Sequence, residues 1–421
     1  MLEFRESIPD GRHRVNGPER SSCFRDSPIP PPCGALYDED PMSESYRILV
    51  SDSIRIWGGA QRFIVELAEG LTRRGHHVVI QTLPGSPLAE RARHKGLPVR
   101  EIRIRTDAAP WTVVPLAVHM RARPYDFVVT TFDKDLRTTG LAARLSGTGA
   151  TVIHTRECDD PVKNKARYRW FYTQVASHII VNSRATLATT LASAPWLDER
   201  RVSVLYKGID LSDYEALDPG PWRERLNPKG DRVVVGFAGQ LVGRKRIDVL
   251  LRALSSPEFS ALPWRLAIAG TGKDEARLRA ETERLRIGDR VEFCGFVDRI
   301  HQWMAAIDVF ALPSFIEGFG YVLAEAEAAG KPCVAYRASS IPEVVVEGET
   351  ALLAEKGNDA EFAGHLQRLV SDAGARERMG KAARRDALQR HGLERMIDRA
   401  EEIFASVQRT PGGRGTARPA G

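Results

Sequence analysis

Two glutamates stand eight positions apart around a glycine-rich turn in the segment SFIEGFGYVLAEAEAAG (314–330). Glu317 precedes the turn, and Glu325 lies beyond it in an alanine-rich stretch that predicts a helix. Glycines at the start of a helix let backbone amides face an anion. We therefore interpret the order as a carboxylate for hydroxyls, glycines for phosphate and a carboxylate for a diol such as ribose. The spacing is common, so other segments must support it.

A basic loop supplies the first support. The segment GQLVGRKRIDVLL begins at Gly239, after a predicted strand, and places Arg244, Lys245 and Arg246 at the start of the next helix. Cations there oppose the helix dipole and need a compensating anion. A diphosphate would supply that anion; three solvated side chains are the alternative.

Two further junctions between a strand and a helix carry paired glycines. Gly58 and Gly59 lie in IWGGAQRF, and Gly270 and Gly272 lie in LAIAGTGKDEARL. Such pairs let a backbone approach a ligand closely, although glycine in a turn is often only a turn. The complete dinucleotide fingerprint is absent, which argues against a nicotinamide or flavin enzyme.

The elements that must position these residues alternate along the chain. Short apolar strands such as YRILVSD and HVVIQTL are each followed by a helical pattern, which predicts βαβ units and buried parallel sheets. The polar segment 211–231 is the predicted linker between two such series. We expect domains at 42–215 and 216–390, with a cleft between the carboxyl ends of their strands, and a terminal helix at 391–408 that packs back on the first domain.

Both ends of the chain differ from this pattern. Residues 1–41 are rich in proline and polar side chains, and residues 409–421 are rich in glycine, so both are predicted to be disordered. We interpret Met42, which directly precedes the first strand, as the natural start.

Composition limits the class of protein. With 421 residues, 43% hydrophobic and 28% charged, the chain suits a two-domain globular protein. It has no apolar run near the ~18 residues of a membrane span, no secretory signal, and five scattered cysteines, which together predict a cytoplasmic protein. The net charge of +6 concentrates in segments 90–107 and 161–172. These predict either solvated faces or a surface for anionic lipid head groups or a phosphorylated acceptor, and nucleic acid is not expected.

From about Tyr46 to Phe404 the sequence resembles the glycosyltransferases of family 4, which have the GT-B fold of two Rossmann-like, doubly wound parallel-sheet domains. EGFGYVLAEA resembles the family's E-x7-E signature, and VGFAGQLVGRKRIDVLL resembles its donor-phosphate loop. The resemblance implies catalytic roles for His154, Glu317, Arg244 and Lys245. It implies donor binding by Gly58, Gly59, Gly239, Gln240, Gly270, Gly272, Phe296, Val297, Gly318, Phe319, Gly320 and Glu325. No metal ion and no cofactor besides the nucleotide sugar are implied.

The chain departs from the family pattern in the phosphate loop, where Gln240 replaces the usual arginine. Arg244, beside Lys245, is the expected substitute, as in some lipopolysaccharide-core members. Asp133 and Asp135 form a D-x-D sequence that in other glycosyltransferases binds metal. Here it falls in the acceptor domain, where we interpret it as a loop or an acceptor contact. His154 follows a strand and has a packed, non-catalytic side chain as its alternative.

The resemblance implies a retaining transferase that moves a sugar from a nucleotide diphosphate to a glycan or lipid-linked glycan. The preferred setting is bacterial lipopolysaccharide or surface polysaccharide synthesis, with the protein peripheral on the cytoplasmic membrane. The alternatives are a non-catalytic GT-B binding subunit, which Gln240 favours, and a nucleotide-sugar epimerase or phosphorylase on the same fold.

Overall fold

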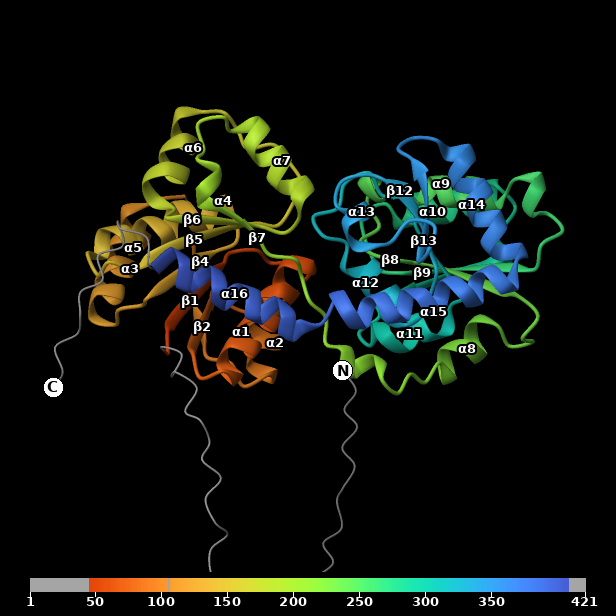
Figure 1. The fold of residues 1–421 in the computed structure, drawn as a ribbon, viewed down its shortest axis with the longest axis horizontal. Helices are drawn as coiled ribbons and strands as arrows, with labels where there is room; N and C mark the ends of the chain where they lie inside the picture. Colours follow the sequence, from red (N-terminus) through yellow and green to blue (C-terminus); the bar gives the residue numbers. More distant parts are fainter. Residues whose placement is uncertain (1–44, 105–106, 409–421) are drawn as a thin grey trace, which may run out of the picture. The chain divides into compact units, whose positions relative to one another are not determined.

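The computed structural model describes residues 45–104 and 107–408. The predictions for residues 1–41, for a start at Met42 and for the tail at 409–421 lie outside these ranges. Within them the chain forms two parallel sheets, as predicted, each covered by helices (Figure 1).

The first sheet has seven strands in the order β3-β2-β1-β4-β5-β6-β7, all paired in parallel. The inner strands are short runs of mostly buried residues, because helices cover both faces of the sheet, whereas the edge strands β3 and β7 are only partly buried. The strands are β1 (Arg47–Asp52), β2 (His77–Thr82), β3 (Val99–Glu101), β4 (Phe127–Thr130), β5 (Thr151–Arg156), β6 (His178–Val181) and β7 (Val202–Val204). The helices are α1 (Gly59–Arg73), α2 (Pro87–His94), α3 (Pro110–Ala122), α4 (Asp133–Asp135), α5 (Leu141–Ser146), α6 (Ala166–Trp170) and α7 (Arg184–Ser193).

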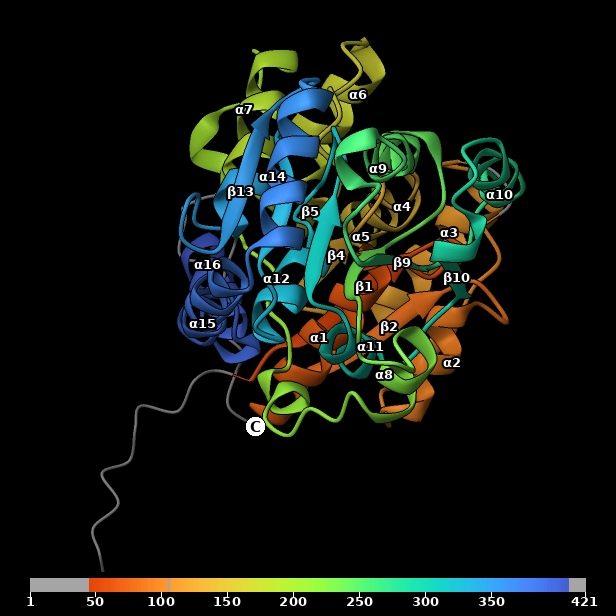
Figure 2. The same cartoon turned by 90° about the vertical axis from the view of Figure 1, so that its right-hand side faces the viewer.

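The second sheet has six strands in the order β10-β9-β8-β11-β12-β13. The strands are β8 (Val233–Ala238), β9 (Trp264–Ala269), β10 (Val291–Gly295), β11 (Val309–Leu312), β12 (Cys333–Arg337) and β13 (Ala351–Glu355). The helices are α8 (Gly220–Leu226), α9 (Ile247–Leu254), α10 (Glu275–Arg284), α11 (Ile300–Ala306), α12 (Tyr321–Ala328), α13 (Ile341–Val344), α14 (Asp359–Ser371) and α15 (Ala373–Arg390). Figure 2 shows α9 and α14 side by side, and the two helices are in contact.

The strand order of each sheet marks where a ligand would bind. β1 pairs with β4, and β8 pairs with β11, although neither pair is consecutive in the sequence. Loops that leave such neighbouring strands diverge and open a crevice at the carboxyl ends of the strands. The loops after β8 and β11 carry the phosphate loop and the E-x7-E segment, and the loop after β4 leads to Asp133.

The chain passes between the two domains twice, and the two connecting segments lie side by side. The backbone near Ile209 pairs with that near His391, through Ile209 N to His391 O at 2.8 Å and Leu393 N to Ile209 O at 3.0 Å. Beyond this point α16 (Leu393–Gln408) packs against α1, and Phe404 stacks on Phe127 of the first sheet. The predicted linker 211–231 is partly ordered: it contains a 3-10 turn, Leu211–Tyr214, and helix α8.

His178 makes the stability of the first domain sensitive to acid. Burial, helped by the charge of Arg201, lowers the pKa of His178 from 6.5 to about 4. The native state therefore binds fewer protons than the unfolded chain between these two pKa values. The neutral His178 side chain therefore makes its full contribution to the free energy of unfolding above about pH 6.5. This contribution falls by roughly 2–3 kcal/mol in total as the pH drops towards 4.

We predict that His178→Gln flattens the fall in stability between pH 6.5 and pH 4, because glutamine does not titrate while it can still reach Ser203 Oγ, 2.9 Å from His178 Nε2. Urea denaturation at several pH values measures this slope. The matched control is His77→Gln, at an exposed position of the same sheet, which should keep the wild-type slope. An unchanged slope in His178→Gln would contradict the assignment.

Candidate functional site

The E-x7-E segment runs from the end of β11 into α12. Gly320 is the N-cap of α12 with φ of 93°, a left-handed conformation that favours glycine. Glu317 and Glu325 are both buried, with 6% and 2% of their surface exposed. Buried carboxylates need partners, and the partners of these two come from different parts of the chain.

Glu317 is paired with Lys245, the lysine of the basic loop. Lys245 lies in a 3-10 turn, Gly243–Lys245, and its Nζ donates to Glu317 Oε1, with both side chains 8% exposed. The neighbouring Arg246 pairs with Asp359 Oδ2 at 3.2 Å. We predicted that the cations of this loop need an external anion. For Lys245 and Arg246 a protein carboxylate supplies an anion, and the binding of a diphosphate by Lys245 stays a prediction.

Arg244, the third cation of this loop, forms no ion pair with a carboxylate of the described residues. Its side chain is exposed and makes one long hydrogen bond, from Nη1 to the carbonyl oxygen of Ile316 at 3.4 Å. It therefore lies beside the E-x7-E turn without a carboxylate partner among the described residues. Gln240 is half-buried at the start of the same loop, and no side-chain hydrogen bond of Gln240 is found there.

The glycines that follow β8 and β9 have a packing reason as well as the proposed ligand role. A Cβ on Gly270 would overlap the carbonyl oxygen of Gly239, and one on Gly272 would overlap the backbone of Leu241. Gly239 itself has φ of 150°. Only glycine lets these two loops pack backbone to backbone.

Phe296 and Val297 follow β10, where the resemblance places the base. Phe296 is an exposed aromatic ring, and Val297 is partly buried against the core of the domain. The guanidinium of Arg91, on α2, lies 5.9 Å from the centre of the Phe296 ring.

Glu325 is paired with Arg62 of α1. Arg62 Nη1 donates to Glu325 Oε1, and Arg62 Nε donates to Glu66 Oε1 at 2.6 Å. Tyr321 completes the network through its hydroxyl, which donates to Glu66 Oε2 at 3.1 Å. This network meets the paired glycines: a Cβ on Gly59 would lie 3.2 Å from the Tyr321 ring, and Gly58 is the N-cap of α1.

Gly318 is the second close approach of the turn. A Cβ at this position would overlap the carbonyl oxygen of Glu157 and the side-chain amide of Asn182. Phe319, next to it, is buried and contacts the ring of Tyr321 edge-on. The turn is therefore fixed by packing on either side.

His154 belongs to a separate polar cluster at the end of β5. Its Nδ1 lies 3.1 Å from both the carbonyl oxygen and the hydroxyl oxygen of Thr130, and these contacts hold the imidazole ring in place. Its Nε2 faces the Tyr172 hydroxyl at 3.3 Å and Asp133 Oδ1 at 3.6 Å. The Tyr172 hydroxyl donates to Asp133 at 2.8 Å and accepts from Arg156 Nη1 at 3.0 Å.

This cluster keeps a negative charge beside the imidazole. Burial alone would raise the pKa of Asp133, but hydrogen bonds from His154 and Tyr172 and the charge of Arg156 hold it well below its usual value. Burial raises the pKa of Tyr172, so its hydroxyl stays a donor. Asp133 is therefore ionised at any pH where the protein would work.

Asp133 and Asp135 do not face one another. Asp135 is fully buried, where its carboxylate accepts from Ser53 N at 3.2 Å and from Ser51 Oγ at 3.3 Å. Burial and the nearby charge of Asp52 raise its pKa. The D-x-D sequence thus splits between two networks, which does not suit a shared metal ligand pair.

Sequence reasoning missed four members of these networks: Arg62, Glu66, Tyr172 and Arg156. Tyr172 lies in the aromatic and basic segment 161–172, which we interpreted only as a surface. No spacing in the sequence joins Arg62 to Glu325, because the two are 263 positions apart.

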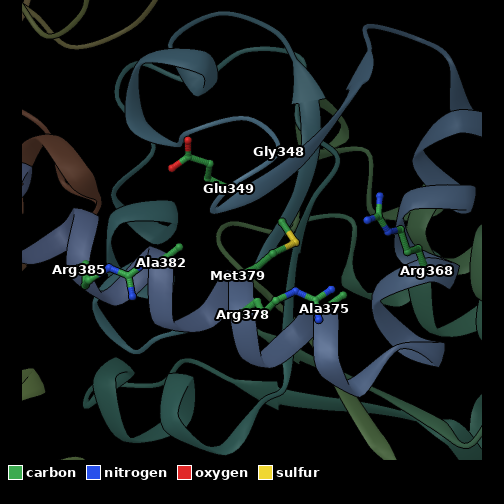
Figure 3. A pocket seen from close by; sticks show the side chains of 8 residues that line it. All are labelled: Gly348, Glu349, Arg368, Ala375, Arg378, Met379, Ala382 and Arg385. Carbon is green, nitrogen blue, oxygen red and sulfur yellow. The ribbon is translucent and has the colours of Figure 1, made fainter.

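A cavity of about 290 Å³ lies elsewhere on the second domain, beside α14 and α15 (Figure 3). It is lined by Gly348, Glu349, Arg368, Ala375, Arg378, Met379, Ala382 and Arg385. None of the predicted site residues lines it, so we assign the candidate site from the side-chain networks and not from this cavity.

Two family models match the chain. The model "Glycosyltransferase Family 4" matches residues 57–213, and "Glycosyl transferases group 1" matches residues 220–386. Between them they cover both domains. The chain belongs to glycosyltransferase family 4.

Relatives of this family 4 protein agree with the assignment. D-inositol 3-phosphate glycosyltransferase of Streptomyces bingchenggensis is 30% identical over 226 residues, and the match spans only about half of each chain, 50% of this one and 49% of that one. The lipopolysaccharide core biosynthesis glycosyltransferase LpsE of Rhizobium meliloti is 27% identical over 350 residues, covering 83% of this chain and 96% of LpsE.

The fold is that of a GT-B protein. HepE of Anabaena, solved in complex with UDP-glucose, superposes with a TM-score of 0.74 at 22% identity, covering 86% of this chain and 100% of HepE. The predicted fold class is therefore confirmed. No helix among the described residues has both the length and the apolar character needed to cross a membrane.

The Lys245–Glu317 pair generates a prediction about stability. Lys245→Met leaves a buried carboxylate without its cation and should lower the free energy of unfolding by about 3 kcal/mol. The double variant Lys245→Met/Glu317→Gln removes both charges and should recover most of that loss. Urea denaturation of the two single variants and the double variant gives the coupling energy. Losses that simply add would contradict the pairing.

Proposed function

We propose that this family 4 glycosyltransferase transfers a sugar from a nucleotide diphosphate to a glycan or lipid-linked glycan, with retention at the anomeric carbon. The observation that carries the proposal is the juxtaposition of Lys245, Glu317 and the unpaired Arg244 where β8 and β11 diverge. That place in an open parallel sheet is where such folds bind ligands.

The chemistry follows from the charges. Departure of the diphosphate from an oxocarbenium-like carbon leaves negative charge on the phosphate oxygens. Arg244 and Lys245 would bind those oxygens, and Glu317, once it shares Lys245 with the diphosphate, would accept hydrogen bonds from the sugar hydroxyls. Glu325 would bind the ribose in place of Arg62.

His154 would face the transferred sugar. Asp133, Tyr172 and the Thr130 carbonyl fix the plane of its ring, which makes these residues positioning groups. We assign no covalent nucleophile. The departing phosphate oxygen would take the proton of the attacking acceptor hydroxyl on the same face, so that the C–O bond to the diphosphate breaks as the bond to the acceptor forms.

We propose UDP as the nucleotide and a bacterial surface glycan as the setting. The support is the fold shared with HepE, solved with UDP-glucose, and the similarity to LpsE over most of both chains. Nucleotide sugars are cytoplasmic substrates, so we place the protein in the cytoplasm, peripheral to the membrane. It would need no cofactor and no metal ion.

We predict that UDP raises the melting temperature of the wild-type protein more than GDP or ADP does. At about a hundred times its dissociation constant a ligand adds ~2.7 kcal/mol of stability. Lys245→Ala and Glu325→Ala should lose most of the shift. Lys381→Ala and Glu377→Ala, an exposed pair on α15, are the matched controls and should keep it.

The outcomes separate the competing functions. A shift with GDP or ADP alone would overturn the choice of UDP and keep the nucleotide-sugar class. No shift with any of the three would contradict the proposal and favour a binding subunit. Slow release of UDP from UDP-glucose by the wild type, absent in Lys245→Ala, would exclude that alternative.

A further inference from the structure

Helix α3 of the first domain is apolar on the side that faces away from the protein. Trp111, Val114 and Val118 are 71%, 54% and 63% exposed. Their spacings of three, four and seven positions place them on one stripe of the helix. Pro115 is exposed on the same stripe, and we call these four residues the α3 face.

The opposite side of α3 is also apolar, because it packs into the domain. Val113, Leu116 and Met120 are buried there. A helix that is apolar all round belongs in an interior or against another apolar phase. Single exposed apolar residues need no explanation, but a contiguous stripe that includes a tryptophan marks a surface that something covers.

The charges around the α3 face indicate what covers it. Helix α3 packs against α5, and neither these two helices nor α6 contains an acidic residue. They expose Arg121, Arg144, Arg167 and Arg169, and Arg123 follows α3 directly. α5 adds Leu145, 60% exposed, and α6 adds Trp170, 48% exposed.

The α3 face is also linked to the His154 cluster. Arg137 pairs with Asp107, three positions before α3, at 2.5 Å, and its guanidinium lies 5.6 Å from the centre of the Tyr168 ring on α6. Arg137 stands four positions after Asp133 in the same helical segment. The elements that carry the α3 face and the basic residues therefore continue into those that carry the polar cluster.

We propose that the α3 face, flanked by Arg121, Arg123 and Arg144, binds the surface of an anionic phospholipid membrane. Apolar side chains with a tryptophan enter the boundary between head groups and acyl chains, and arginines that form no ion pair with a carboxylate of the described residues pair with the phosphates. A protein partner of ordinary composition would have to supply acidic side chains around an apolar groove, whereas an anionic bilayer presents both. This assignment concerns a surface and does not depend on the proposed reaction.

The test is flotation of the full chain with vesicles of phosphatidylcholine alone and of phosphatidylcholine with about a third phosphatidylglycerol. The wild type should float with the anionic vesicles and be released by high salt. Trp111→Ser/Val118→Ser should bind about tenfold less. Arg121→Glu/Arg123→Glu should lose binding to a similar extent, and Trp111→Phe should keep most of it.

The matched controls are Leu388→Ser, an exposed leucine on α15, and Arg395→Glu, an exposed arginine on α16; both should float like the wild type. Unchanged melting temperatures show that the variants fold, and Val114→Ser replaces any variant that does not. Binding that the α3 variants leave unchanged would overturn the proposal. A wild-type protein that does not bind anionic vesicles would also overturn the proposal. A wild-type dimer that the Trp111→Ser substitution dissociates would overturn it as well.

Discussion

A buried ion pair between a lysine and a glutamate joins two loops at the carboxyl edge of the second sheet. Lys245 comes from the loop after β8 and Glu317 from the loop after β11, two strands that are neighbours in the sheet and far apart in the sequence. Burying either charge alone would be costly, because each loses its hydration. The pair therefore fixes both loops at the point where the sheet opens, and Arg244 is carried there with them.

The second glutamate of the motif is neutralised differently. Glu325 receives its cation from Arg62, on α1, within a network that also includes Glu66 and Tyr321. A ribose at Glu325 and a diphosphate at Lys245 would each compete with a protein ion pair. On the proposed function, donor binding would exchange the partners of two carboxylates that the folded protein already buries.

The sequence was sufficient for the architecture and for the motif. Apolar strands followed by amphipathic helices, as in α1 and α9, predict parallel sheets because each element buries one side against the next. The partners in the site were not predictable, because they depend on tertiary contacts: Arg62 with Glu325, and Asp133 with Tyr172 and His154. The carboxylate partners of Lys245 and Arg246 were not predictable for the same reason, since Glu317 and Asp359 become their neighbours only in the folded chain. The sequence did not predict helix α8, because proline and glycine at its start are typical of a linker.

The most direct test of this account is a crystal structure of the protein with UDP. We predict diphosphate oxygens within hydrogen-bond distance of Lys245 Nζ and Arg244, and ribose hydroxyls on Glu325 with Arg62 displaced from it. A diphosphate bound elsewhere, for example among Arg368, Arg378 and Arg385 of the cavity beside α15, would contradict the account.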